Sequence, residues 1–324
     1  MSEKRPNSVI YAAALMIAVV LVIAVLLYYY APESPTDSDM YEIDYAAEQN
    51  MTLDASAESM NLLIDMDQGE LDIRFSDLNG TALELNVTME GEATTSDPAR
   101  ILQWTLIHDQ DGTNATVEFD LRINQTVLTS GLMVRCQFVI DPSYAIGLDV
   151  KDTVGDIEVN GTANLKLNAV SLESDAGAIH VDLMEGTNLS SNIHIRGLLG
   201  EVRLNWDEVI LAPGPHEVDV TTATGSIVLL VSQSQGFQGQ VNWTIGTNLG
   251  NVNAAFYTSG HISSNITAEV GTGLLNSASL IGYDTNRTEN RVAATSFNYL
   301  DDGNFEARMD VNVGNVVLVA NWVP

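Results

Sequence analysis

The chain has 324 residues, 45% of them hydrophobic, and its 43 acidic and 13 basic side chains give a formal net charge of −30 at pH 7. A surface this acidic repels nucleic acid and anionic membrane surfaces, which argues against both as partners of the folded part. Cys136 is the only cysteine, so an internal disulfide is excluded and the fold depends on its apolar core.

Residues 9–30 (VIYAAALMIAVVLVIAVLLYYY) contain no charge, glycine or proline. As a helix they would span roughly 33 Å, enough to cross the hydrocarbon core of a membrane. Lys4 and Arg5 precede this segment and acidic residues follow it, so we expect residues 1–8 in the cytoplasm and the rest outside. The length of the apolar run favours an uncleaved signal anchor over a cleaved signal peptide. The sequence therefore predicts a single-pass protein of the cytoplasmic membrane.

Residues 31–59 are predicted to form an acidic stalk. Pro32 and Pro35 block continuation of the helix, and the Ser/Thr-rich, acidic composition buries too little apolar surface to fold alone.

An N-terminal β region is predicted over residues 60–145. NLLIDMDQGELDIRF alternates apolar and polar residues around a turn at Asp67–Gly69, and WTLIHDQDGTNATVEF predicts a hairpin that turns at Asp109–Asn114. Cys136 alternates in step with apolar neighbours, which indicates a small core residue. Because no helical period is sustained over residues 60–324, we expect an all-β ectodomain.

A glycine-centred phrase recurs over residues 146–324, with successive spacings of 22, 23, 25 and 25 residues from Gly155 to Gly250. Its glycines are Gly155, Gly177, Gly200, Gly225, Gly250 and Gly314. A short strand repeat of this period predicts a β-solenoid, in which each coil covers the apolar face of the last; a β-sandwich is the alternative. We expect the glycines at corners that need positive φ or close backbone approach. Residues 309–324 are predicted to form the terminal coil, and residues 281–291 a polar excursion between coils.

Five passages resemble the putative-adhesin β-repeat family (the DUF4097 and DUF2807 type) over roughly residues 60–324: LLIDMDQGELDIRF, FVIDPSYAIGLDVKDTVGDIEVNG, LESDAGAIHV, VTTATGSIVL and VNVGNVVLV. Pro142 and residues 148–159 match its characteristic passage, although an aspartate precedes the proline here. The resemblance implies a β-solenoid outside a cell, often membrane-anchored. It supplies no catalytic or binding residues.

Ten N-x-S/T sequons are candidate glycosylation sites. They begin at Asn50, Asn79, Asn86, Asn114, Asn124, Asn160, Asn188, Asn242, Asn265 and Asn286. Together with the acidic composition, they favour a glycoprotein of an archaeal envelope.

No catalytic, cofactor-binding or metal-ligating residues are identified from motifs. The five histidines lack metal-site spacing, and no hydrolase, redox or nucleotide motif occurs. Calcium is the cofactor that the sequence leaves open, because acidic turns occur at residues 65–70, 109–112 and 301–303. Against calcium, these turns lack the distal glutamate of a calcium-binding loop.

The prediction is a cell-surface structural or adhesin-like protein, without enzymatic activity, that presents its acidic repeats to envelope polysaccharide or surface proteins. The alternative is a polysaccharide-binding or polysaccharide-cleaving β-helix, in which Asp156, Asp175 and Asp182 gather near Arg196 and Arg203 on adjacent coils. A third possibility is an accessory domain for the assembly of a neighbouring membrane protein.

Overall fold

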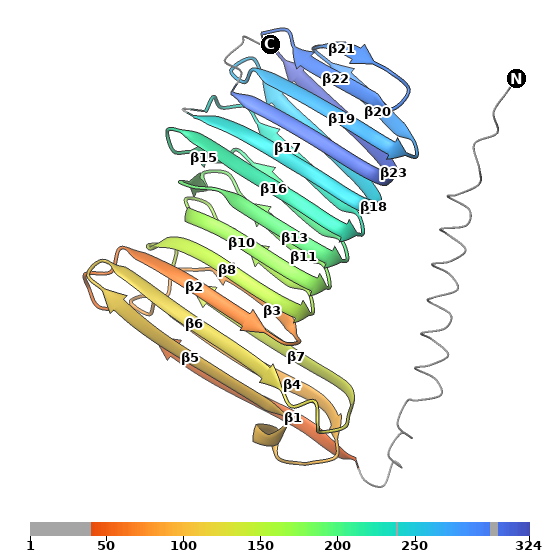
Figure 1. The fold of residues 1–324 in the computed structure, drawn as a ribbon. Helices are drawn as coiled ribbons and strands as arrows, with labels where there is room; N and C mark the ends of the chain where they lie inside the picture. Colours follow the sequence, from red (N-terminus) through yellow and green to blue (C-terminus); the bar gives the residue numbers. More distant parts are fainter. Residues whose placement is uncertain (1–39, 238, 299–303) are drawn as a thin grey trace, which may run out of the picture. The chain divides into compact units, whose positions relative to one another are not determined.

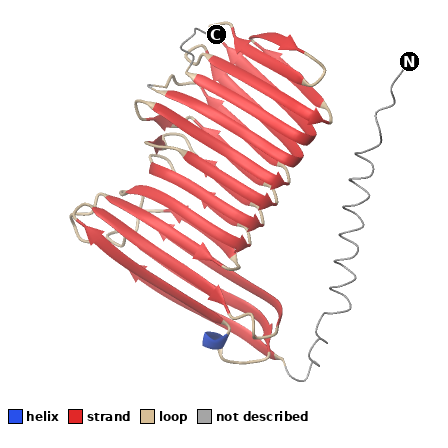
Figure 2. Cartoon of the chain, viewed as in Figure 1, coloured by secondary structure: helices blue, strands red, loops and turns tan. Residues whose placement is uncertain are grey.

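The computed structural model describes residues 40–237, 239–298 and 304–324. The predicted cytoplasmic residues 1–8 and signal anchor 9–30 lie outside these ranges. Within them, no helix has the length and apolarity needed to cross a membrane. Residues 42–324 form one compact unit. Strands dominate this unit, and a single 3-10 turn at Pro98–Arg100 is its helical element over the described ranges (Figure 2).

The all-β prediction is confirmed, and the strands form two layers (Figure 1). In spatial order, the first layer contains β5 (Leu102–Asp111), β6 (Asn114–Ile123), β2 (Ser59–Met66), β8 (Ala145–Val154), β10 (Lys166–Ala176), β13 (Ile193–Leu199), β16 (Pro215–Thr224), the first halves of β18 (Gln240–Ser259) and β23 (Phe305–Val323), β19 (Ser264–Thr272), β22 (Arg291–Ser296) and β21 (Tyr283–Arg287).

The second layer contains β1 (Tyr41–Met51), β4 (Leu83–Ala93), β7 (Thr129–Ile140), β3 (Glu70–Phe75), β9 (Ile157–Asn160), β11 (Ile179–Leu183), β14 (Val202–Asp207), β17 (Ile227–Gln233), the second halves of β18 and β23, and β20 (Leu275–Ile281). Two short strands, β12 (Asn188–Leu189) and β15 (Ile210–Leu211), extend the first layer beside the start of β10.

Equivalent strands of successive repeats pair in parallel and in register. Val170 lies opposite Ile193, which lies opposite Val218, which in turn lies opposite Trp243. The inward side chains of the two layers meet in one core: the rings of Trp206 in the second layer and Trp243 in the first are 5.0 Å apart. The arrangement therefore combines the parallel stacking of a solenoid with two packed layers, as in a sandwich.

The repeat glycines stand where the chain passes from the first layer to the second. All six have positive φ, between +143° and +156°, as do Gly69 and Gly273 at equivalent corners. A Cβ on Gly225 would lie 1.7 Å from the carbonyl oxygen of Gly200, and one on Gly250 would lie 1.7 Å from that of Gly225. Both the backbone angle and the close approach therefore require glycine at these corners.

The core lies between the layers and is filled by the alternating apolar residues of each strand. Cys136 is one of them, 1% exposed on β7 opposite Leu71. Burial, together with the charge of Asp152, raises the pKa of the Cys136 thiol to about 12, so this thiol is a core group and a poor nucleophile.

The predicted stalk is wrong for residues 41–51, which form β1 hydrogen-bonded to β4. Ile43 and Met51 of this strand are buried, and the Tyr45 hydroxyl accepts a hydrogen bond of 3.2 Å from Trp104 Nε1. Alternation within YEIDYAAEQNM supplies an apolar face that the acidic composition concealed.

The boundary predicted at residue 145 does not separate two bodies. β2 and β3 pair directly with β8 and β9, so the first glycine corner is Gly69 and the stack begins before residue 146. The predicted hairpin at residues 104–119 is present as β5–β6, which turns between Asp111 and Asn114.

The C-terminal strand is not the terminal coil. β23 lies between β18 on one side and β19 and β20 on the other. The segment predicted as a polar excursion contains β21 and leads into β22, and these two antiparallel strands extend the first layer beyond β19. The repeats are thus stacked in an order that differs from their order along the chain.

The Gly225→Ala variant should lose at least about 3 kcal/mol of unfolding free energy, because a Cβ at this φ is strained and also meets the Gly200 carbonyl. Gly112→Ala is the control: Gly112 also has positive φ, but no atom lies within 4 Å of the added Cβ, so the loss should be about 1 kcal/mol. Urea unfolding of the full chain measures both values. Equal losses would show that backbone strain alone, without the contact between the added Cβ and the Gly200 carbonyl, accounts for the need for glycine at position 225.

Candidate functional site

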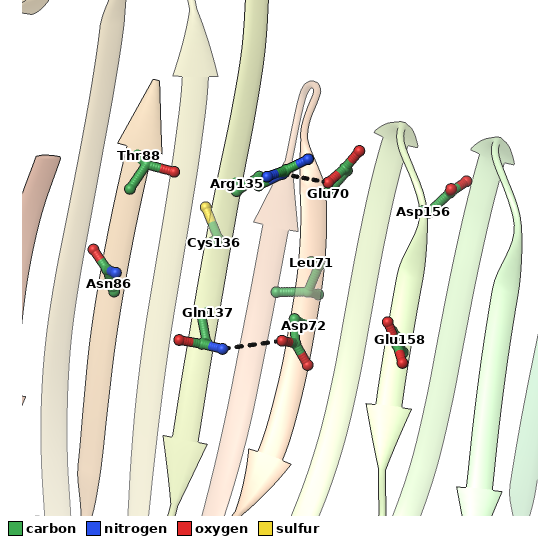
Figure 3. A pocket seen from close by; sticks show the side chains of 10 residues that line it. All are labelled: Glu70, Leu71, Asp72, Asn86, Thr88, Arg135, Cys136, Gln137, Asp156 and Glu158. Carbon is green, nitrogen blue, oxygen red and sulfur yellow. Dashed lines mark hydrogen bonds and ion pairs between the residues drawn. The ribbon is translucent and has the colours of Figure 1, made fainter. Parts of the chain in front are cut away.

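An open groove of about 470 Å³ lies on the outer surface of the second layer, across β4, β7, β3 and β9 (Figure 3). Its lining combines carboxylates, amides, a hydroxyl and one guanidinium. The lining residues are Glu70, Leu71, Asp72, Asn86, Thr88, Arg135, Cys136, Gln137, Asp156 and Glu158.

Strand alternation directs the polar residues of β3 into this groove. In ELDIRF, Leu71 and Ile73 are buried, whereas Glu70 and Asp72 point outward. The parallel register places Glu70 opposite Arg135 and Asp72 opposite Gln137.

Two cross-strand contacts order the groove floor, as Figure 3 shows. Arg135 Nε donates to Glu70 Oε2 at 2.6 Å, and Gln137 Nε2 donates to Asp72 Oδ2 at 3.1 Å. The side chains of Arg135 and Glu70 are 59% and 49% exposed, so water screens their ion pair and it adds little to stability. The effect of this ion pair is to hold the hydrogen-bonding groups of Arg135 and Glu70 in fixed positions on an open surface.

Carboxylates outnumber cations along the groove. Asp156 Oδ1 accepts a 2.7 Å hydrogen bond from the backbone N–H of Ala178, and Glu158 Oε1 accepts one of 3.0 Å from Asn160 Nδ2. Each carboxylate has further acceptor capacity, since an ionised carboxylate offers about four lone-pair sites. With the amides of Asn86 and Gln137, this set can both accept and donate hydrogen bonds to a hydroxyl-rich ligand.

A buried carboxyl group lies in the core beside the corner at Gly155. Asp152 is 4% exposed, and neither of its oxygens has a hydrogen-bond partner among the described residues. Burial raises its pKa to about 7; the nearby backbone N–H of Val154 partly opposes the shift, and the charges of Asp156 and Asp175 add to it. The folded protein therefore holds a proton on Asp152 more strongly than the unfolded chain does.

The stability of the protein should consequently fall as pH rises from about 4 through 7, because ionised Asp152 is costly only in the folded state. Asp152→Asn should remove this component, raising the unfolding free energy at pH 8 by about 4 kcal/mol with little change at pH 4. Denaturant unfolding at both pH values measures the difference. Asp149→Asn, on the exposed side of the same strand, is the control; an equal gain there would point to general charge repulsion.

The five residues considered for catalysis do not converge. Arg196 points outward from β13 in the first layer, whereas Asp182 on β11 and Arg203 on β14 point outward from the second. Asp182 accepts a hydrogen bond from Asn205, and Arg203 contacts Glu201 at 3.4 Å. Only Asp156 of the five lines the groove.

The acidic turn at residues 65–70 has cationic and backbone partners. Arg122 contacts Asp65 at 2.8 Å and Asp67 at 3.4 Å, and the hydrogen bond to Arg122 lowers the pKa of Asp65. The backbone N–H of Ile123 also donates to Asp67. This turn therefore ties β2 and β3 to β6. Residues 301–303 lie outside the described ranges, within which no group of three His, Cys, Asp or Glu side chains is arranged to hold a metal ion.

The ten sequon asparagines all retain some solvent exposure. Asn50, Asn79, Asn114, Asn188 and Asn286 are exposed, and Asn86, Asn124, Asn160, Asn242 and Asn265 are partly buried. Asn86 lines the groove, with its Oδ1 atom buried. Asn124 donates its amide N–H to the carbonyl of Arg100, which engages the nitrogen that would carry a glycan.

Most groove residues were not singled out from the sequence. Glu70 belongs to a noted acidic turn and Asn86 to a sequon, but Arg135 and Gln137 belong to an ordinary alternating strand. The only sequence signal available was that polar outward residues are dense in both ELDIRF and VRCQF. Neither passage indicates that β3 and β7 are neighbours.

Comparison with family models finds no match, and neither does comparison with curated proteins. Two solved structures are similar over most of the chain. One is a putative cell adhesion protein from Clostridium sporogenes ATCC 15579, with a TM-score of 0.39 and 12% identity, covering 86% of this chain and 100% of the other. The second is a putative adhesin from Bacteroides fragilis NCTC 9343, with a TM-score of 0.36 and 12% identity, covering 89% of this chain and 100% of the other.

Proposed function

We propose that the protein is a non-enzymatic, adhesin-like component of a cell surface whose groove binds a hydroxyl-rich polymer of the envelope. The observation that carries this proposal is the row of ordered hydrogen-bonding groups that four paired strands present to solvent. An open groove suits a chain that extends beyond the site, and carboxylates and amides are groups that hold sugar hydroxyls.

The proposal includes attachment to the cytoplasmic membrane by residues 9–30, with the β-strand unit outside. The apolar length of that segment and the basic residues before it support this placement.

We also propose glycosylation at the exposed sequons, such as Asn79, Asn114 and Asn286. Peptide mass spectrometry of the protein from its native envelope tests the glycans: occupancy at Asn286 with none at Asn124 is expected, because Asn124 uses its amide within the fold.

Binding of the liposome-reconstituted full chain to purified envelope polysaccharide tests the groove. The Asp72→Asn, Glu158→Gln double variant removes two charges from the lining without changing side-chain size, and should weaken binding at least about tenfold. Asp207→Asn is the matched control, because this exposed residue also points outward from the second layer but does not line the groove.

Saturable binding that the double variant loses and the control keeps would support the groove as the site. Equal loss in both variants would assign binding to overall charge. Release of new reducing ends from the polysaccharide, abolished by the double variant, would instead make the protein a polysaccharide-cleaving enzyme.

A further inference from the structure

Besides residues 9–30, three long stretches of this acidic chain contain no Asp, Glu, Lys or Arg: 221–260, 270–283 and 311–324. Since 17% of all residues are charged, a charge-free run as long as the first is unexpected from composition. The three stretches are separated by segments that do carry charges, including Glu269 and Asp310.

The fold brings parts of these stretches together on the outer surface of the second layer. β17, the second half of β18, the second half of β23 and β20 are consecutive neighbours there. Leu230 lies opposite Ala255, which lies opposite Val319. We call this surface the uncharged face; it comprises Val228, Leu230, Ser232, Asn253, Ala255, Tyr257, Asn276, Ser279, Ile281, Val317, Val319 and Asn321.

The uncharged face continues around the glycine corner. Leu249 and Val313 precede Gly250 and Gly314, lie opposite each other in register, and are 44% and 46% exposed. Leu274, beside the corner glycine Gly273, is 73% exposed. Apolar side chains thus stay in water along a continuous surface. By contrast, at the groove end of the same layer the outward positions carry charges such as Asp72 and Glu158.

Sequons are absent from this surface although asparagine is common there. Seven asparagines lie on the uncharged face or its corner, and none begins an N-x-S/T sequence: Asn248, Asn251, Asn253, Asn276, Asn312, Asn315 and Asn321. Asn312 donates to Asn248 at 2.8 Å and Asn315 donates to Asn251 at 3.0 Å, so these amides bond along the stack. All ten sequons of the chain lie elsewhere.

Charge selects the kind of partner that can cover such a face. A cationic partner is attracted to the acidic surfaces of a chain with net charge −30, and gains nothing from a surface without charge. Two copies of the chain repel one another when acidic surfaces approach. This repulsion is weakest when the contacting surfaces of both copies carry no charge.

The area is sufficient for a weak specific contact. Four strands about 4.8 Å apart, seven residues long at about 3.3 Å each, project to roughly 450 Å² per copy before the corner is added. Two such surfaces with their corners bury about 1,000 Å², the lower end of specific protein interfaces.

We propose that two copies of this chain associate through their uncharged faces. The contact is isologous, with the same residues of both copies meeting across a two-fold axis. It rests on the charge pattern of residues 221–324 and is independent of what the groove binds.

Sedimentation velocity of the detergent-solubilised full chain tests this proposal. Wild-type protein should form dimers at concentrations up to about 100 µM, and raising NaCl should strengthen the association, because salt screens the repulsion between the acidic surfaces. Leu230→Glu should weaken the dimer at least tenfold. Thr244→Glu is the matched control, because Thr244 is exposed on the neighbouring β18 but points outward from the opposite layer; the dimer should be unchanged.

Tyr257→Asp provides a second variant on the face, and circular dichroism establishes that each variant is folded. A wild-type chain that stays monomeric at every salt concentration would overturn the proposal. Equal weakening by Leu230→Glu and Thr244→Glu would overturn it too. A monomer that binds a neutral polysaccharide, and loses that binding on Leu230→Glu, would reassign the face to sugar recognition.

Discussion

The stack depends on the contact of one glycine corner with the next. At every corner after Gly69, the carbonyl oxygen of one glycine occupies the place where a side chain on its neighbour would begin. This contact determines which residue of one repeat lies over which residue of the next, and a shift by one residue would turn every inward side chain outward. The aligned columns of outward residues, from which both the groove and the uncharged face are built, follow from that register.

The same corners explain the polar residues inside the core. Asp152, Ser174, Thr222 and Thr247 are buried at equivalent positions just before the glycines. Ser174 Oγ donates to the carbonyl of Gly155, and Thr247 Oγ1 donates to that of Gly225, each at 3.3 Å. At two of these positions a short hydroxyl therefore donates to a glycine carbonyl of the corner, whereas the Thr222 hydroxyl has no hydrogen-bond partner among the described residues. Asp152 occupies the same position, and its burial there, with the charges of Asp156 and Asp175 nearby, raises its pKa and favours the protonated acid.

The sequence predicted what depends on local pattern. Alternation identified the strands and the buried Cys136, and the spacing from Gly155 to Gly250 identified equivalent positions. The sequence did not predict the groove, because that site requires β3 to lie beside β7. The residues that pair between these two strands, such as Glu70 and Arg135, are 65 positions apart in the chain. The stalk prediction failed at Ile43 and Tyr45 for a similar reason: three alternating apolar residues are a weak signal until β4 is available to pair with them. The stacking order was equally hidden, since every repeat presents much the same edge to its neighbours.

The position of β23 has a consequence for how the protein is made. Each strand from β8 to β18 pairs with at least one strand that precedes it in the chain, so these strands can add to the stack in the order in which they are synthesised. β19 and β20 cannot, since their parallel partner is the nineteen-residue strand at the extreme C-terminus. The segment from residue 264 onward therefore joins the stack only once β23 is present, and a chain cut short before β23 leaves β18 as the open edge of both layers.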